Sequence, residues 1–312
     1  MSIESNMVEA TTNAPILPNE CYVKALQVKH IVCFSGGESS AIVAVELVRK
    51  FGKENVILVN HNINSKKEVE DIKRFKKEVA NYLGLEITYA NIDNILNPDL
   101  IPNQFEVCLK AGAMTSFNGH ALCTAKLKTE PFYNWLALNF PRGNTLFEDE
   151  KECVIYYGFD RHEFSRIQRR TGLLGSMGYK TDYPSLWKER TINKIEEIGI
   201  IKPATYEVFE HANCIGCLKA GLLHWYVVYH TDIETYMEAV NLEEEVNYTV
   251  HTVVRDKVKM SITLTELAPI YERMKTDGIP ITEHQNKIKF GHLIKKYQIE
   301  EINANKPCEC TD

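Results

Sequence analysis

The chain of 312 residues has no apolar run that approaches the roughly 20 residues of a membrane-spanning helix. Its opening, MSIESNMVEATTNAPILPNE, lacks both the basic start and the apolar stretch of a secretion signal. Positive charge is also in deficit, since 36 Lys and Arg stand against 42 Asp and Glu and give a formal net charge of −6. We therefore expect a cytoplasmic protein without a membrane partner, in which any nucleic-acid contact depends on a local basic patch.

The cysteines argue against a disulfide framework. There are nine, an odd number, spread along a chain without an export signal. This pattern favours a reducing compartment, in which thiols stay available to bind metal or to react. The remaining composition, with 44% hydrophobic and 25% charged residues, is ordinary for a globular protein.

Short apolar runs alternate with amphipathic segments through the first part of the chain, which predicts an α/β fold with a parallel sheet and helices on both faces. The expected strands cover residues 30–34, 55–60, 86–91 and 152–159. The expected helices cover residues 40–51, 65–84 and the segment RHEFSRIQRR at 161–170. We divide the chain into a flexible leader (1–27), a nucleotide-binding domain (28–204), and a Cys-x-x-Cys segment with a helical annex and mobile tail (205–312), with a short strand near 249–254.

A glycine-containing turn follows the first expected strand. Gly36 and Gly37 allow backbone N–H groups to approach an anion, and Ser35, Ser39 and Ser40 add hydroxyl groups at the start of a helix. The turn after the first strand of such a sheet is a common phosphate site. Neither the three-glycine dinucleotide pattern nor the Gly-Lys-Ser ending of the Walker loop is present. An ordinary tight turn with a serine cap is the alternative.

The segment FSGGESSAIVA resembles the pyrophosphate (PP) loop of the adenine-nucleotide α-hydrolase-like superfamily, which includes ATP pyrophosphatases, tRNA-thiolating enzymes and phosphoadenylyl-sulfate (PAPS) reductases. Ser35, Gly36, Gly37 and Ser40 match the family pattern. Ser39 stands where Asp is usual, and Glu38 stands where Lys is frequent. The pair Glu38-Ser39 is similar to the PAPS reductase branch.

Three further segments match this family in order. The segment CTAKLKTEPF (123–132) resembles a motif that includes Lys128, and GFDRHEFSRIQRR (158–170) matches Gly158, Glu163 and Arg166. The segment HANCIGCLKAG (211–221) supplies a Cys-x-x-Cys pair. The resemblance covers about residues 28–230 and implies a Rossmann-like PP-loop domain that binds ATP or PAPS, with Mg²⁺ as an aid to the phosphates.

The resemblance also implies roles for single residues. Lys128 and Arg166 would neutralise phosphate, and His61 and Asn62, at the tip of the second strand, would reach adenine or ribose. Glu163 is expected to pair with a nearby arginine rather than to act as a base. For Arg169 and Arg170, a solvated basic face is as good an interpretation as a phosphate site.

Cys214 and Cys217 have a spacing that lets two thiolates bind one ion, and the family places Cys123 beside the same site. Two interpretations stay open. The three cysteines would hold a [4Fe–4S] cluster with one iron open, or they would form a Cys₃His zinc site together with His211. Buried cysteines without a ligand are the alternative.

The sequence favours sulfur-related chemistry of one of two kinds. In the first, Cys310, which follows Glu309 as in PAPS reductases, would attack the sulfate sulfur of PAPS, with a thioredoxin-like reductant as partner. In the second, ATP would adenylate a carbonyl oxygen of tRNA or another nucleic acid, and sulfide held by the cysteines would displace AMP. The alternative to both is a catalytically reduced nucleotide-binding protein with a structural zinc site, which acts through a protein or nucleic-acid partner. A homo-oligomer is compatible with each.

Overall fold

The computed structural model describes residues 28–91, 97–117, 119–142, 152–212, 214–255, 258–286 and 300–301. Its centre is a five-stranded parallel sheet with the order β3-β2-β1-β4-β5. The strands are β1 (Lys29–Cys33), β2 (Val56–Asn60), β3 (Ile87–Tyr89), β4 (Cys153–Tyr156) and β5 (Lys180–Asp182). Strands β2 and β3 follow β1 towards one edge of the sheet, and β4 and β5 then continue from the other side of β1 towards the opposite edge. The direction in which strands are added therefore reverses beside β1.

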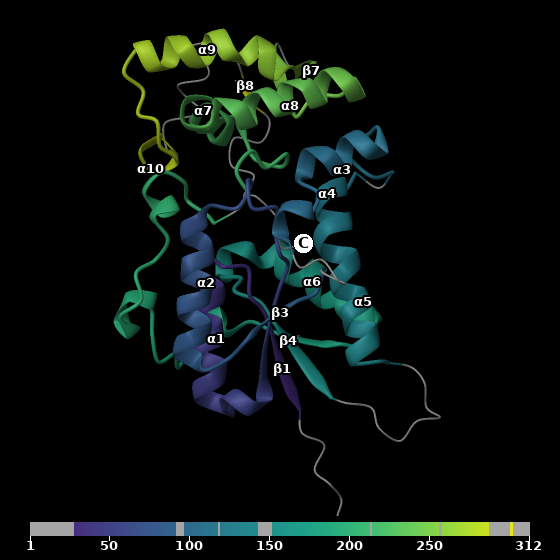
Figure 1. Cartoon of the computed structure of the whole chain (residues 1–312), viewed down its shortest axis with the longest axis vertical. Coiled ribbons are helices and arrows are strands. Elements are labelled where there is room, and N and C mark those ends of the chain that lie inside the picture. Colours follow the sequence, from purple (N-terminus) through teal and green to yellow (C-terminus); the bar gives the residue numbers. More distant parts are fainter. Residues whose placement is uncertain are drawn as a thin grey trace, which may run out of the picture.

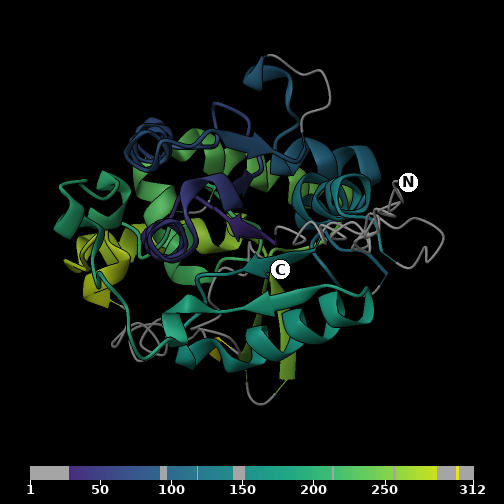
Figure 2. The ribbon, with the colours of Figure 1, turned by 90° about the horizontal axis from the view of Figure 1, so that it is seen from below.

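Helices cover both faces of this sheet (Figures 1 and 2). Helices α1 (Glu38–Phe51) and α2 (Glu70–Leu83) pack on one face, in a core that includes Val32 and Leu58. Helices α5 (Glu130–Asn139) and α6 (Phe164–Ser176) pack on the other face, in a core that includes Ile31 and Val59. Neighbouring strand residues thus point into opposite cores, and this accounts for the continuous apolar runs of the strands. The predicted α/β class is confirmed.

Local sequence explains where the elements stop. Gly84 ends α2 in the left-handed conformation, and its N–H donates to the carbonyl groups of Ala80 and Asn81, as the glycine predicted. Strand β5 was not predicted, because its three residues, Lys180–Asp182, are polar and none of them is fully buried. Its pairing with β4 defines it instead.

The connection from β3 to β4 contains α3 (Gln104–Ala111), the short α4 (Leu122–Thr124) and a π-helical turn, η3 (Ala125–Thr129), which runs directly into α5. Single π-helical turns occur often at functional sites. Short 3₁₀ turns complete the fold at Lys53–Asn55, Pro98–Leu100, Arg161–Glu163, Pro184–Leu186, Ile195–Ile198 (η6) and Ala204–Glu207 (η7).

The described part of the annex lies beyond the carboxyl ends of the parallel strands (Figure 1). It contains α7 (Leu222–Thr231), α8 (Ile233–Val246), α9 (Leu264–Thr276) and α10 (Glu283–Asn286). It also contains an antiparallel sheet of β7 (Val258–Ile262), β6 (His251–Arg255) and β8 (Glu300–Glu301), of which only a strand near 249–254 was expected.

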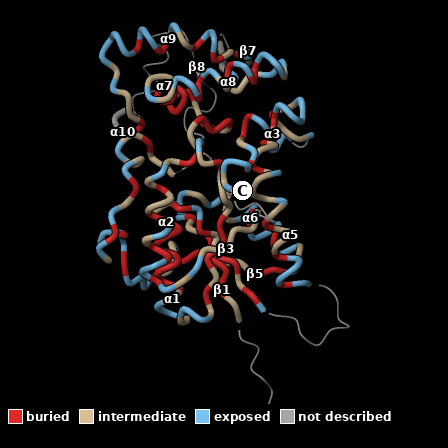
Figure 3. Tube along the Cα trace, viewed as in Figure 1, coloured by how far each residue is buried: buried red, intermediate tan, exposed pale blue. Residues whose placement is uncertain are grey.

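The annex has its own core, in which Trp225, Tyr226, Tyr236 and Tyr271 are almost completely buried. Figure 3 shows that buried residues are concentrated in this core and in the parallel sheet. None of the helices in the described ranges combines the length and the apolar character of a bilayer crossing. The expected leader and most of the expected tail, including Cys310, lie outside the described residues.

Candidate functional site

The glycine turn lies at the carboxyl end of β1, as the sequence predicted. Gly36 has a φ of +86°, and a Cβ there would lie 3.0 Å from the Lys76 side chain. A larger residue is therefore excluded by both conformation and space. The Ser40 hydroxyl donates to the Gly37 carbonyl over 2.8 Å, while the Ser35 and Ser39 side chains remain exposed.

Groups that the sequence did not reveal hold this turn in place. The buried Asn60 side chain donates from β2 to the Phe34 carbonyl. The Tyr206 hydroxyl, from η7, accepts a hydrogen bond of 3.1 Å from the Glu38 N–H. Since that N–H belongs to the first residue of α1, Tyr206 uses one of the helix donors that would otherwise face an anion.

Glu38 points away from the turn, because its carboxylate accepts a hydrogen bond of 3.3 Å from the Ile195 N–H of η6. Glu38, Ser39 and Gly158 line an open hollow that contains further charged residues. The cations and histidine of this hollow are Arg161, His162 and Arg190. The Glu38 carboxylate is thus directed to a backbone donor of η6, and anion binding at Gly36 and Gly37 stays a prediction.

A separate pocket opens beside the turn at the carboxyl ends of β1, β2 and β4, where the direction of winding reverses. It encloses about 700 Å³ of space not filled by protein, part of which is open solvent. Its lining consists of Cys33, Phe34, Ser35, Val59, Asn60, His61, Ile63, Lys128, Thr129, Phe132, Tyr157, Arg170 and Ala212. We call it the switch-point pocket, because ligands of parallel sheets bind at such a reversal.

Two cations, Lys128 and Arg170, line the switch-point pocket. Arg170 is 6% exposed, donates to the Tyr133 hydroxyl over 3.0 Å, and has its guanidinium 5.5 Å from the Tyr157 ring centre. The solvated-face interpretation is therefore wrong for Arg170, whereas Arg169 is exposed. Burial raises the pKa of the Cys33 thiol to about 12, so this thiol stays protonated.

Arg166 and Glu163 form an ion pair with each other, so the expected arginine partner of Glu163 is confirmed. The Arg166 guanidinium also lies 4.3 Å from the Phe159 ring centre, and Glu163 accepts a hydrogen bond from the Asp160 N–H. Neither residue is among those that line the switch-point pocket. Their contact with a nucleotide stays a prediction.

His61 lies at the end of β2, where it was expected to face a ligand. Its Nε2 is buried and makes no hydrogen bond within the described residues. Burial, together with the charge of Lys128, lowers its pKa to about 3, so the ring is neutral. The Asn62 backbone exchanges two hydrogen bonds of 2.7 Å with the Asn91 side chain, which fixes the chain direction after His61.

A second pocket, of about 480 Å³, brings together Cys123, Cys214 and Cys217. We call it the cysteine pocket; all three thiols are outside any disulfide. Three residues line both pockets: His61, Ile63 and Lys128. The two pockets are therefore neighbours, with the neutral His61 and the cationic Lys128 between them. Three thiol donors suit zinc or an iron–sulfur cluster, and the donor set fits either group.

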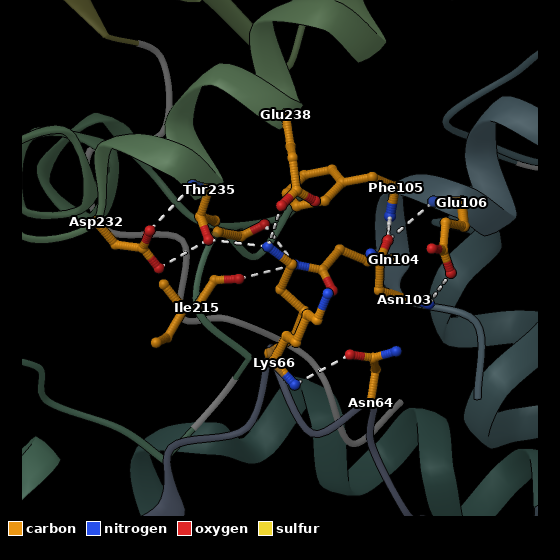
Figure 4. A network of polar contacts seen from close by, with 12 residues as sticks. Asn64, Lys66, Asn103, Gln104, Phe105, Glu106, Ile215, Asp232, Thr235 and Glu238 are labelled. Atoms are coloured by element: carbon orange, nitrogen blue, oxygen red, sulfur yellow. Dashed lines mark hydrogen bonds and ion pairs between the residues drawn. The ribbon is translucent and has the colours of Figure 1, made fainter. Parts of the chain in front are cut away.

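The turn between Cys214 and Cys217 depends on Gly216. Its φ is +68°, and a Cβ there would lie 2.4 Å from Thr235 Cγ2 and 3.1 Å from the Phe105 ring. Gln104 of α3 donates to the Ile215 carbonyl over 2.7 Å and to the Gly216 carbonyl over 3.3 Å (Figure 4). These contacts fix the turn from two sides.

Lys67 connects the same turn to the annex. Its carbonyl accepts from the Ile215 N–H over 3.2 Å. Its buried ammonium donates to Thr235 over 2.9 Å and to Glu238 over 2.7 Å, both on α8. No sequence pattern indicated that Lys67 is buried, because a lysine in a charged segment is normally exposed.

His211 was expected to complete a Cys₃His zinc site. It lies beside Glu283 of α10 and His224 of α7, with 3.6 Å between its Nε2 and the Glu283 Oε1. It is not among the residues that line the cysteine pocket. A bond from His211 to the cysteines' ion stays a prediction, and Cys310 falls outside the described residues.

Comparisons of the chain with family models, with curated proteins and with solved structures find no match.

Proposed function

We propose that this chain is an adenine-nucleotide-binding enzyme, similar to the PP-loop and PAPS reductase family, that transfers sulfur to an acceptor activated by adenylation. The observation that carries the proposal is the contact between the two pockets. A pocket suited to a nucleotide and a pocket with three thiols share His61, Ile63 and Lys128. An adenylated acceptor in the first would lie next to sulfur held in the second.

The switch-point pocket supplies the groups that an adenine nucleotide needs. Phe34, Val59 and Phe132 offer apolar contact to a base, and the unpartnered His61 Nε2 offers a hydrogen bond. Ser35, Gly36 and Gly37 present backbone and hydroxyl donors for phosphate oxygens. Lys128 and the buried Arg170 supply positive charge at the same pocket, with Mg²⁺ as a further source for ATP.

The cysteine pocket would serve as the sulfur site. A [4Fe–4S] cluster or zinc held by Cys123, Cys214 and Cys217 would supply a Lewis-acidic centre for sulfide. Gly216, Gln104 and Lys67 hold the Cys-x-x-Cys turn, so the thiols keep their position while an acceptor binds. Lys128 would stabilise the negative charge that develops on the leaving phosphate as sulfur attacks the adenylated carbon and AMP departs.

Binding is tested by thermal shift and calorimetry with ATP, PAPS and GTP, on the wild type and on Lys128→Ala. Lys126→Ala is the matched control, since Lys126 lies in the same π-helical turn but is exposed and paired with Glu130 over 2.8 Å. We expect adenine nucleotides to bind, Lys128→Ala to weaken binding roughly tenfold or more, and Lys126→Ala to change little. Equal behaviour of the two variants, or no binding of ATP or PAPS, contradicts the nucleotide site.

Chemistry is tested by ATP turnover and by the metal content of anaerobically purified protein. Formation of AMP and pyrophosphate, together with a cluster or zinc that Cys214→Ser removes, supports adenylation-dependent sulfur transfer. PAPS reduction that depends on Cys310 supports the reductase alternative. Nucleotide binding without turnover of either compound identifies a catalytically reduced protein that acts through a partner.

A further inference from the structure

Three ionisable side chains that are distant in the sequence meet in the annex, outside both pockets. They are His211, which precedes the Cys-x-x-Cys pair, His224 on α7 and Glu283 on α10. One ligand atom from each lies within 4.8 Å of the other two. Two imidazoles and one carboxylate form a common set of protein ligands for zinc.

The separations are those of ligand atoms that share one ion. His211 Nε2 lies 3.6 Å and His224 Nδ1 lies 3.2 Å from the same carboxylate oxygen, Glu283 Oε1, and the shorter contact is also a hydrogen bond. Tetrahedral zinc with bonds of about 2.0–2.2 Å places its ligand atoms about 3.4 Å apart, and the two distances lie on either side of this value.

The surroundings hold the ligands in place. His224 is 3% exposed and Glu283 is 7% exposed. The second carboxylate oxygen of Glu283 accepts a hydrogen bond of 2.8 Å from the Glu210 N–H, which fixes its orientation. The Phe209 ring packs against both imidazoles, at 6.1 Å from His211 and 5.1 Å from His224. A carboxylate placed in such apolar surroundings requires compensating positive charge.

We propose that His211, His224 and Glu283 bind a zinc-class divalent ion, as a site separate from the three cysteines. The ion would join three segments: the chain that leads to Cys214, helix α7 and helix α10. With three protein ligands, the fourth position is left to water or to another donor. The site is independent of the proposed nucleotide chemistry and does not require it.

The test uses the full-length chain with Cys123, Cys214 and Cys217 all changed to serine, so that any zinc left is bound elsewhere. We expect one equivalent of zinc by elemental analysis after purification without chelators. In a cobalt-loaded sample we expect visible ligand-field bands without a thiolate charge-transfer band. Adding His224→Gln or Glu283→Gln should weaken zinc binding at least roughly 100-fold.

The matched control is His230→Gln, because His230 is also on α7 but bonds the Tyr271 carbonyl instead. It should keep the metal. His211→Gln provides a second ligand variant at a side chain that is 25% exposed, so its effect can be measured even if a change at the buried His224 prevents folding. No zinc in the triple-serine protein, or full zinc retention by both His211→Gln and His224→Gln, overturns the proposal.

Discussion

At Gly158, the absence of a side chain allows the loop after β4 to pack closely against the glycine turn and the start of α1. A Cβ at this position would lie 2.9 Å from the Ser39 carbonyl carbon and 3.0 Å from the Ser40 nitrogen, both backbone atoms that cannot rotate away. The sequence resemblance pointed to Gly158, and the close approach of the β4 loop to α1 supplies the physical reason.

We expect Gly158→Ala to lower the free energy of unfolding by about 1–3 kcal/mol, because α1 or the β4 loop must shift. Gly172→Ala is the control: Gly172 lies in α6 with open space around it, and alanine there should raise stability by about 0.5–1 kcal/mol. Urea unfolding measures both. A Gly158→Ala protein as stable as the wild type would show that the contact is not rigid.

The buried, neutral His61 predicts that the free energy of unfolding decreases as the pH falls. Its pKa of about 3 in the folded protein is below the unfolded value near 6.5, so protons bind the unfolded chain more strongly. The stability that depends on neutral His61 is therefore complete above pH 6.5 and is lost as the pH falls towards 3. Its share of the loss approaches about 1 kcal/mol per pH unit.

Unfolding by urea at pH 7, 5.5 and 4.5 tests this expectation, with His61→Gln and the exposed His162→Gln compared with the wild type. The loss of stability on acidification should be smaller in His61→Gln and unchanged in His162→Gln. The same pH dependence in all three proteins would contradict the assigned role of burial.

At the level of single residues, sequence patterns identified pocket residues that belong to short motifs, but they did not identify contacts between residues that are distant in the sequence. The Cys-x-x-Cys spacing and the motif around Lys128 identified residues that do line adjoining pockets. Nothing in the spacing of His211 indicated Glu283 as its neighbour, because α10 reaches it only through the folded annex. Arg170 and Arg169 are adjacent and chemically alike, so only packing distinguishes the buried one from the exposed one.

Among the elements, the junction between α2, the Cys-x-x-Cys turn and α8 depends on the buried Lys67. We expect Lys67→Met to lose the bonds to Thr235 and Glu238, together with the contact of the ammonium with the Phe105 ring. Because Glu238 is 42% exposed and stays hydrated, the loss should be about 1 kcal/mol.

Hydrogen exchange at the Ile215 amide should also accelerate in Lys67→Met, since its acceptor is the Lys67 carbonyl. Lys73→Met is the control: its ion pair is with Glu70, which is 84% exposed, so stability should change by less than about 0.5 kcal/mol. Unchanged exchange at Ile215 would mean that Gln104 and Gly216 hold the turn without Lys67.

Periodicity and glycine positions were enough to predict β1 to β4 and helix α1 to within about three residues. Helices α2 and α6 were also predicted, but α2 begins five residues later and α6 ends six residues later than expected. These patterns were insufficient for strands that are defined by pairing with a neighbouring strand rather than by their own residues. Strand β5 has no apolar pattern of its own, and β6 and β7 form a hairpin that appeared only as one short strand. The π-helical turn at Ala125–Thr129 cannot be distinguished from an α-helix by its residue types.

In the whole molecule, residues from the middle of the chain, before the expected boundary, contribute to the core of the annex. Phe105 and Cys108 of α3, with Met114, belong to the core that also contains Trp225 and Tyr236 of the annex. The expected boundary near residue 204 therefore separates these three residues from the core of the annex to which they belong.

A fragment of residues 1–204 should for this reason fail to fold cooperatively, because Phe105, Cys108 and Met114 would lose the surface that buries them. Near-ultraviolet circular dichroism and urea unfolding, measured beside the full-length chain, test this expectation. A sharp unfolding transition of the fragment would show that α3 does not need the annex.

The winding of the chain from Leu122 through η3 into α5 is continuous, and it carries both Cys123 and Lys128. Cys123 and Lys128 therefore lie on one continuous helical segment, so a displacement of this segment moves the backbone at both residues. Such a displacement would change the lining of both pockets together.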